Sequence, residues 1–354
     1  MKKLVKLTKN IFVTQTPIYV VFFVTSVCNA KCKMCFNWQN IEAHKTDLDL
    51  EEVKKVFSNF SEIQQLTLSG GEPFLRNDLP EMLEYVSIKN QVQRITIPTN
   101  ALLTDKIIDT TSKILNKIKK STQLNISLSI EGIDDKHDEV FQVPGAFEKT
   151  KKTYEKLQPL LEIHKNLSLE IAICCSKFNK DHIKDTIKYC NEKFPSCAIS
   201  IVLARGDTRD DSSKDVTIEE YQDIINFYNK FKKEESGKEK FGKVYNALGQ
   251  IVNNQVIEVM KTEEMPNKCY AGSNMIVIQN NGDVFPCEYL NKKLGNLREF
   301  HYDIKQILSM QEAKEARKHI KDKKCYCTWE CALSNNLVSN PLKYPSILKE
   351  MIKD

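Results

Sequence analysis

The sequence has 354 residues, of which 41% are hydrophobic, and its formal net charge is +5 at neutral pH. This length allows one large domain or two ordinary ones. The scattered positive excess excludes a nucleic-acid groove, and no apolar run is long enough to span a bilayer. Twelve cysteines are present, and eight of them stand in groups with ligand-like spacing. Without a secretory signal, this usage predicts a cytoplasmic metal-binding protein rather than one with disulfides.

Strand-like and helical patterns alternate through the first 205 residues. The strand-like runs, rich in Ile, Val, Leu and Thr, lie near 18–25, 66–69, 93–97, 124–130, 167–174 and 198–204. The helical patterns lie near 50–60, 78–88, 104–119, 146–162 and 180–193. This alternation predicts β/α units on a parallel sheet. Six strands are too few for a closed barrel of eight.

Three cysteines directly follow the first strand-like run. Cys28, Cys32 and Cys35 form a C-x3-C-x2-C pattern. A four-iron cluster normally has four cysteine ligands, so three thiolates leave one iron open. An open metal position is typical of a site that binds a reactant. The loop therefore predicts a cluster that takes part in chemistry.

Further polar and small residues stand where other predicted strands end. They are Gly70, Gly71, Glu72 and Pro73 after the second strand, Thr99 and Asn100 after the third, Ser129 and Glu131 after the fourth, and Arg205 after the sixth. Taken singly, each has an ordinary interpretation as a turn, a helix cap or a surface residue. Because β/α barrels gather their chemistry at the carboxyl ends of strands, the set predicts one cofactor site.

The cysteine loop and the GGEP sequence at 70–73 resemble the radical S-adenosylmethionine (SAM) superfamily. The resemblance implies an α/β fold with an open partial barrel of six β/α units. It places the GGEP turn at the SAM amino group, the backbone of Phe36 against adenine, and Ser129 and Glu131 facing the cofactor. Thr99 and Asn100 then suit the ribose. The guanidinium fork of Arg205 suits the SAM carboxylate.

One segment departs from the resemblance. The stretch 134–147 is similar to a family sequence that often reads HDxIRGxPGSF, but Phe141 and Gln142 stand in place of its Arg-Gly pair. Pro144, Gly145 and Phe147 are kept. Any contact of the family's arginine is therefore absent here or supplied by another residue.

A second cysteine set begins at Cys269-x12-Gly282-x4-Cys287 and ends with Cys325, Cys327 and Cys331. The Asn-Asn-Gly-Asp sequence at 280–283 predicts a hairpin turn. The set resembles the SPASM and Twitch extensions, small α+β domains that bind auxiliary iron–sulfur clusters. Five thiolates do not complete two clusters, so we expect one, held by Cys269, Cys287, Cys331 and either Cys325 or Cys327. A zinc site is the alternative.

Two other groups of residues complete the predicted sites. Glu288 follows Cys287 directly; in sulfatase-maturing relatives an acidic residue there is a proposed base, and an exposed glutamate is the alternative. Cys174, Cys175, Cys190 and Cys197 lack ligand spacing and are assigned to packing.

The expected boundaries are an N-terminal extension over 1–16, the partial barrel over 17–216, a helical bridge over 217–262, the auxiliary cluster domain over 263–335 and a tail over 336–354. Only about two dozen residues precede the cluster loop, so we expect no leader-peptide-binding domain there.

The resemblance implies reductive cleavage of SAM to a 5′-deoxyadenosyl radical, which takes hydrogen from a substrate C–H bond. It also implies reduced flavodoxin or ferredoxin as electron donor. The predicted substrate is a small polar metabolite such as a sugar or aminocyclitol, to be oxidised or epimerised, with a peptide as the alternative. A non-catalytic electron-transfer or zinc-binding protein is the rival of another class. We expect no nucleic-acid partner and no transmembrane segment.

Overall fold

The computed structural model describes residues 16–41, 46–234 and 243–353. The predicted N-terminal extension therefore lies outside the described residues, except for residue 16. The same holds for the Glu-Lys-rich stretch at 235–242 in the predicted bridge.

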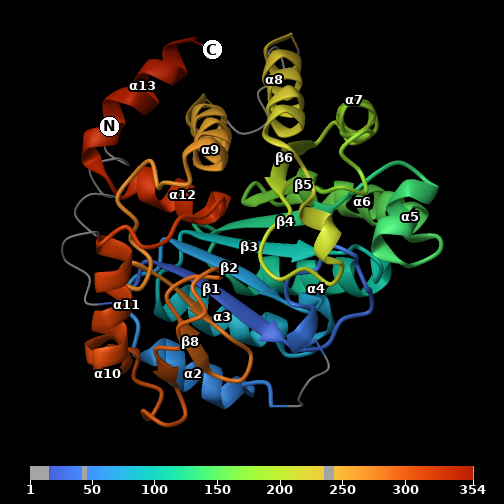
Figure 1. Ribbon diagram of the computed structural model, residues 1–354. Coiled ribbons are helices and arrows are strands. Elements are labelled where there is room, and N and C mark those ends of the chain that lie inside the picture. The colour runs from blue at the N-terminus through green and yellow to red at the C-terminus, as the bar shows by residue number, and fades with distance from the viewer. Residues whose placement is uncertain (1–15, 42–45, 235–242, 354) are drawn as a thin grey trace.

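The described strands form one open sheet in the order β6-β5-β4-β3-β2-β1-β7-β8-β9 (Figure 1). From β6 through β7 all neighbours are parallel, while β8 and β9 run antiparallel. The bounds are β1 Tyr19–Thr25, β2 Gln65–Gly70, β3 Arg94–Thr99, β4 Gln123–Ser129, β5 Leu167–Cys175, β6 Cys197–Leu203, β7 Met275–Ile278, β8 Asp283–Phe285 and β9 Gly295–Asn296. The predicted α/β class with a parallel, unclosed sheet is confirmed.

Helices connect the parallel strands and continue beyond them. Their bounds are α2 Leu50–Ser58, α3 Leu79–Lys89, α4 Thr104–Lys117, α5 Asp135–Phe141, α6 Ala146–Ile163, α7 Ile183–Lys193, α8 Ile218–Glu234, α9 Lys243–Thr262, α10 Ile304–Ser309, α11 Gln311–Lys321, α12 Glu330–Val338 and α13 Tyr344–Lys353. Short 3₁₀ turns lie at Trp38–Asn40, Pro73–Leu75, Asp211–Lys214 and Pro341–Lys343. Within the described ranges, none of these helices combines the length and the apolar character that a bilayer span requires.

The extension joins the barrel sheet instead of forming a sheet of its own. β7 pairs in parallel with β1, with Tyr19 opposite Met275 and Phe22 opposite Ile278. An unclosed sheet leaves the backbone of its outer strand unpaired, and β7 satisfies that edge. The hairpin predicted at 280–283 connects β7 to β8, and Gly282 there has a φ of +88°.

The two faces of the parallel sheet differ in chemistry, because successive side chains along a strand alternate. One face is aliphatic and fully buried against the connecting helices, with Leu66, Ile95, Ile126 and Ile171 at 0% exposure. We call the opposite one the inner face. On β1 it is apolar: Tyr19, Val21 and Phe23 pack with Trp329 and with β7. From β2 to β5 the inner face carries mostly polar residues, which are described below.

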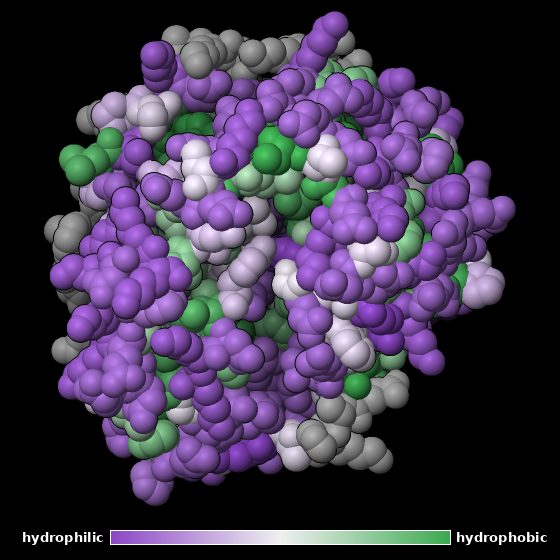
Figure 2. All heavy atoms as spheres, in the orientation of Figure 1, coloured by the Kyte–Doolittle hydropathy of each residue, from purple (hydrophilic) through white to green (hydrophobic). Residues whose placement is uncertain are grey.

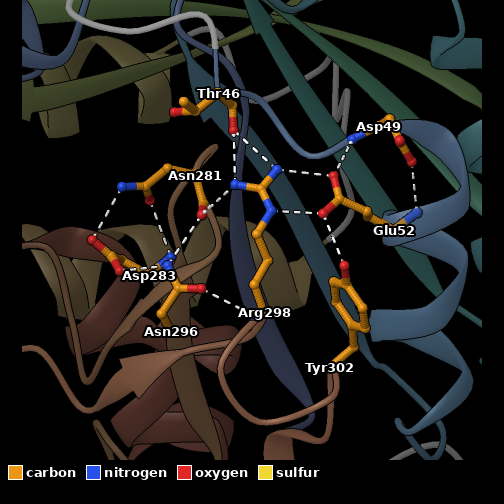
Figure 3. A network of polar contacts seen from close by, with 8 residues as sticks. All are labelled: Thr46, Asp49, Glu52, Asn281, Asp283, Asn296, Arg298 and Tyr302. Carbon is orange, nitrogen blue, oxygen red and sulfur yellow. Dashed lines mark hydrogen bonds and ion pairs between the residues drawn. The ribbon is translucent and has the colours of Figure 1, made fainter.

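Polar contacts fix the extension against the start of α2 (Figure 3). Arg298 forms a two-pronged ion pair with Glu52, at 2.6 Å from Nε to Oε1 and 2.9 Å from Nη2 to Oε2. It also donates to the carbonyl oxygens of Thr46 and Asn281. Glu52 itself completes a capping box with Asp49 at the N-terminus of α2. The extension and the barrel are therefore held together by charged groups as well as by the shared sheet.

The surface in the space-filling view is mostly hydrophilic, with scattered hydrophobic residues between the charged ones (Figure 2). Among the described residues, the exposed large apolar side chains include Ile163 and Leu348. Exposed apolar residues are normal for a folded chain.

Candidate active site and cluster sites

The first cysteine loop leaves the carboxyl end of β1 and is held from the side by α5. The amides of Lys31 and Lys33 donate to the carbonyl oxygens of Phe141 and Val140, at 3.3 and 3.0 Å. Phe141, one of the residues that depart from the family pattern, is 1% exposed. It packs with Ala30 and the Cys28 and Cys32 side chains. The apolar Phe141 side chain therefore packs with the cluster loop at a position where the family sequence has arginine.

The three thiols of this loop form one electrostatic group. Burial raises the pKa of Cys32 well above its usual range, and the charges of Cys35 and Cys28 raise it further. Such mutual repulsion between thiolates is relieved when they share a metal centre, because ligand binding requires the deprotonated form. The donor set thus fits three ligands of a cluster.

The turn after β2 approaches the cysteine loop so closely that only glycine fits. A Cβ on Gly71 would lie 2.0 Å from the carbonyl oxygen of Val27, and one on Gly70 would lie 2.4 Å from that of Thr25. The amides of Gly71 and Glu72 already donate to the oxygens of Thr25 and Val27, both at 2.8 Å. What the turn can offer a ligand is therefore carbonyl oxygen, which suits an ammonium group.

Glu72 connects the ends of β2 and β3. It is 1% exposed and accepts from the Thr99 hydroxyl at 2.9 Å and from the Asn100 amide at 2.8 Å. Burial raises the pKa of Glu72 to about 7, although its hydrogen bonds oppose the shift. The Asn100 side chain donates to Asn29 at 2.7 Å. Glu72 thus positions the predicted ribose residues against the cysteine loop.

Ser129 ends β4 half-buried, and the Glu131 carboxylate turns towards the end of β5. It accepts from the amide of Cys174 at 2.7 Å and is 4% exposed. Burial raises the pKa of Glu131 to about 8, and its own amide donates to His137 at 3.1 Å. In the structure this carboxylate therefore links the end of β4 to the end of β5 by a hydrogen bond.

Arg205 joins the two cysteine sites. Its guanidinium lies 5.4 Å from the ring centre of Phe36, the neighbour of Cys35. It donates to Glu288, the neighbour of Cys287, at 3.0 Å. Glu330 faces it at 3.6 Å. The structure therefore engages Arg205 with two carboxylates of the extension, whereas the sequence reasoning assigned it to SAM; that contact stays a prediction.

Four of the five cysteines of the extension line one cavity of about 90 Å³. They are Cys269, Cys287, Cys325 and Cys327. The rest of the lining is largely apolar and includes Met265, Leu290 and Ile320. Cys331 does not line the cavity. Burial and then the charge of Glu288 raise its pKa to about 11, while a hydrogen bond with Tyr19 opposes the shift.

No group of three or more His, Cys, Asp or Glu within the described ranges stands at the spacing of a single metal ion. Thiols around a four-iron cluster stand farther apart, because a cube of iron and sulfide lies between them. The four-thiol cavity fits such a group by its donor set. By contrast, Cys175, Cys190 and Cys197 lie in the main core at 1% exposure or less, in agreement with their assignment to packing.

Sequence reasoning did not find two residues of this region. Glu330 begins α12 and accepts from the amide of Leu203 at 2.8 Å, and Tyr19 hydrogen-bonds Thr67 across the inner face at 3.3 Å. A carboxylate directly before Cys331 was the one local signal for Glu330. Tyr19 lay inside an apolar strand pattern and gave no such signal.

Comparison with known proteins identifies the two parts of the chain. Residues 22–168 match the family described as the radical SAM superfamily, and residues 269–332 match SPASM, described as an iron–sulfur cluster-binding domain. A protein of Methanosarcina barkeri named "AdoMet-dependent heme synthase" is 27% identical over 82% of either chain. A "Probable GTP 3',8-cyclase" of Methanococcus maripaludis is 29% identical over 38% of this chain and 43% of its own.

The fold agrees with this result. The structure described as "Native anSMEcpe with bound AdoMet" covers 95% of this chain and 96% of its own, with a TM-score of 0.63 at 18% identity. The radical SAM domain implies SAM and a four-iron cluster, and the SPASM domain implies auxiliary iron–sulfur clusters. The chain therefore contains a radical SAM domain followed by a C-terminal SPASM domain.

Proposed function

We propose that this chain is an enzyme that takes hydrogen from a C–H bond of a small polar metabolite, such as a sugar or aminocyclitol. The auxiliary cluster then supports oxidation or epimerisation of the substrate. We place the reaction in the cytoplasm, with reduced flavodoxin or ferredoxin as electron donor, because the cysteines need a reducing compartment. The cysteines assigned above serve as ligands of the two clusters.

The observation that carries the proposal is the polar inner face of the sheet from β2 to β5. Gln65 donates to the hydroxyls of Thr67 and Thr96, both at 3.1 Å. Farther along, Asn125 donates to Glu170 at 2.7 Å and accepts from Ser168 at 2.9 Å. Hydroxyl, amide and carboxylate groups suit a polyol or amino-polyol, and a buried polar lining disfavours analogues that lack the matching groups.

The residues of the chain then have distinct tasks. Bound at the first site, the cluster and SAM supply the electron transfer and the radical that removes hydrogen. The carbonyl oxygens of the Gly70–Gly71 turn orient the ammonium end of SAM, and Glu72 holds Thr99 and Asn100 near the ribose. Glu288 receives the proton that an oxidised hydroxyl loses, and Arg205 orients that carboxylate.

A second candidate follows from relatives that align with most of the chain. The relatives named heme synthases align with most of this chain, so formation of heme, the product in their name, is an alternative activity. The mostly polar side chains on β2 to β5 of the inner face favour a polar substrate over the largely apolar macrocycle of a heme precursor. A peptide substrate is the third possibility that the experiment includes.

The test uses anaerobically reconstituted protein with a reductant, SAM and one candidate substrate at a time. The panel contains aminocyclitols and sugars deuterated at carbon, a heme precursor and a synthetic peptide. We expect 5′-deoxyadenosine that carries deuterium from an aminocyclitol or sugar. Transfer from the heme precursor or the peptide instead would reject the proposed substrate class. Intact clusters without any 5′-deoxyadenosine would support the non-catalytic rival.

A further inference from the structure

Residues 324–329, which include Cys325 and Cys327, have no regular secondary structure, and α12 begins directly after them at Glu330. Cys325 and Cys327 both line the cavity of about 90 Å³, as does Tyr326 between them. The C-x-C spacing therefore presents both thiols to one site.

The other two thiols reach the same cavity from either side of the hairpin. Cys269 precedes β7, and Cys287 follows β8. All four thiols therefore line one space, which is otherwise bounded largely by apolar side chains such as Met265 and Ile320.

Cys331 is not part of the cavity lining, although it packs against the same apolar cluster as Cys287 and Cys327. It lies in the first turn of α12, and its neighbours by charge are Glu288, Arg205 and Glu330, with a hydrogen bond to Tyr19. Tyr19 projects from β1 on the inner face and also contacts Thr67 at 3.3 Å. None of these neighbours of Cys331 lines the four-thiol cavity.

We propose that the four thiols that line the cavity hold the auxiliary cluster between them and that Cys331 stays outside the ligand set. The four are Cys269, Cys287, Cys325 and Cys327. This differs from the ligand set expected from spacing, which included Cys331 and only one of Cys325 and Cys327. The inference does not depend on the identity of the substrate.

A consequence for the reaction follows from the number of ligands. Four thiolates complete a four-iron cluster, so no iron of the auxiliary cluster is open to substrate. A closed metal site does not coordinate a reactant. The auxiliary cluster therefore serves as a carrier of electrons, and the substrate contacts protein groups instead of an iron of this cluster.

The ligand set is tested by alanine variants of each of the five cysteines in the full-length chain, with Cys190→Ala as the matched buried control. Iron and sulfide are counted after anaerobic reconstitution. We expect Cys331→Ala and Cys190→Ala to keep two clusters. We expect each of the other four variants to keep one. Loss of the second cluster in Cys331→Ala, or its full retention in the Cys325 or Cys327 variant, would overturn the proposal.

Two further measurements keep this test decisive. The spectral change of the first cluster on SAM addition shows that a variant has folded, and serine replaces alanine in any variant that lacks it. Closure of the auxiliary cluster is tested with cyanide while SAM occupies the first cluster. An unchanged electron paramagnetic resonance spectrum is expected; a cyanide-dependent shift would show an open iron and contradict the proposal.

Discussion

Arg205 at the end of β6 and Glu288 after β8 form a buried ion pair of 3.0 Å between the radical SAM domain and the extension. The side chains of both residues are largely shielded, at 14% and 8% exposure. Glu330 faces the same guanidinium at 3.6 Å, so two carboxylates share one cation. Because the same guanidinium lies 5.4 Å from the ring centre of Phe36, Arg205 links Glu288, the proposed base, to a residue next to the first cluster loop.

Replacement of Arg205 should be costly because it leaves two buried carboxylates without a cation. We expect Arg205→Met to lower the free energy of unfolding by about 3–5 kcal/mol, measured by urea denaturation of the iron-free protein. Glu288→Gln keeps Arg205 paired with Glu330 and should cost less. A loss below about 1 kcal/mol in Arg205→Met, as at an exposed pair, would show that the cluster of charges is not buried in solution.

The buried carboxyl of Glu131 should make the free energy of unfolding fall as the pH rises. Burial raises its pKa from an ordinary 4.5 to about 8, so the folded state holds a proton that the unfolded chain releases. This stabilisation is complete below pH 4.5 and is lost as the pH rises through about 8. One such proton changes the free energy of unfolding by about 1.4 kcal/mol per pH unit at most.

Between pH 6.5 and 8, the effect of Glu131 on stability can be measured without a contribution from its neighbour His137. Burial lowers the pKa of His137 from 6.5 to about 4, so its own contribution is fully present above pH 6.5 and is lost only on acidification. Glu131→Gln mimics the protonated carboxyl and should show a flatter profile than wild type across this window in urea denaturation. Equal slopes in both proteins would contradict the assignment.

Gly71→Ala tests the close approach of the GGEP turn to the cysteine loop. Its Cβ would collide with the Val27 carbonyl, so the loop must shift. We expect loss of the SAM-dependent spectral change at the first cluster, while the auxiliary cluster stays. Gly249→Ala in α9 is the control, because no atom lies within 4 Å of its Cβ; it should behave as wild type. A normal SAM-dependent spectral change in Gly71→Ala would show that the turn can shift to accommodate the added Cβ without loss of SAM binding.

The Arg298–Glu52 pair should contribute more than an ordinary surface ion pair because its geometry is two-pronged. We expect Arg298→Ala to cost about 1–2 kcal/mol in urea denaturation. Lysine at 298 should recover less than half of this, since an ammonium group lacks the planar fork. Lys113→Ala, which removes an exposed pair with Asp109, is the control and should cost under about 0.5 kcal/mol. Equal losses of stability at the two positions would mean that the two-pronged Arg298–Glu52 pair contributes no more than an exposed ion pair.

Much of the fold followed from the sequence because the strands are long, β-branched and separated by amphipathic helices. Helix α5 was missed because Asp135–Phe141 is short and its backbone is stabilised by contacts with the cluster loop, which no local pattern records. The pairing of β7 with β1 was missed for the same reason, since it joins segments more than two hundred residues apart.

The candidate site divides in the same way. Cys28 and the GGEP turn stand at strand ends, so their positions followed from the order of the strands. The partner of Arg205 lies 83 residues farther along the chain, and only the packing of the extension brings it near. Cys331 was grouped with Cys327 by spacing, but Cys327 lines the four-thiol cavity and Cys331, in the first turn of α12, does not.

The central claim is that the first three cysteines hold a cluster whose open iron takes SAM. The most direct measurement is electron paramagnetic resonance of the reduced, anaerobically reconstituted chain before and after SAM addition. We predict a change in the signal that Cys32→Ala abolishes, and formation of 5′-deoxyadenosine in the same sample. Zinc at these thiols, or a signal that SAM leaves unchanged, would contradict the account.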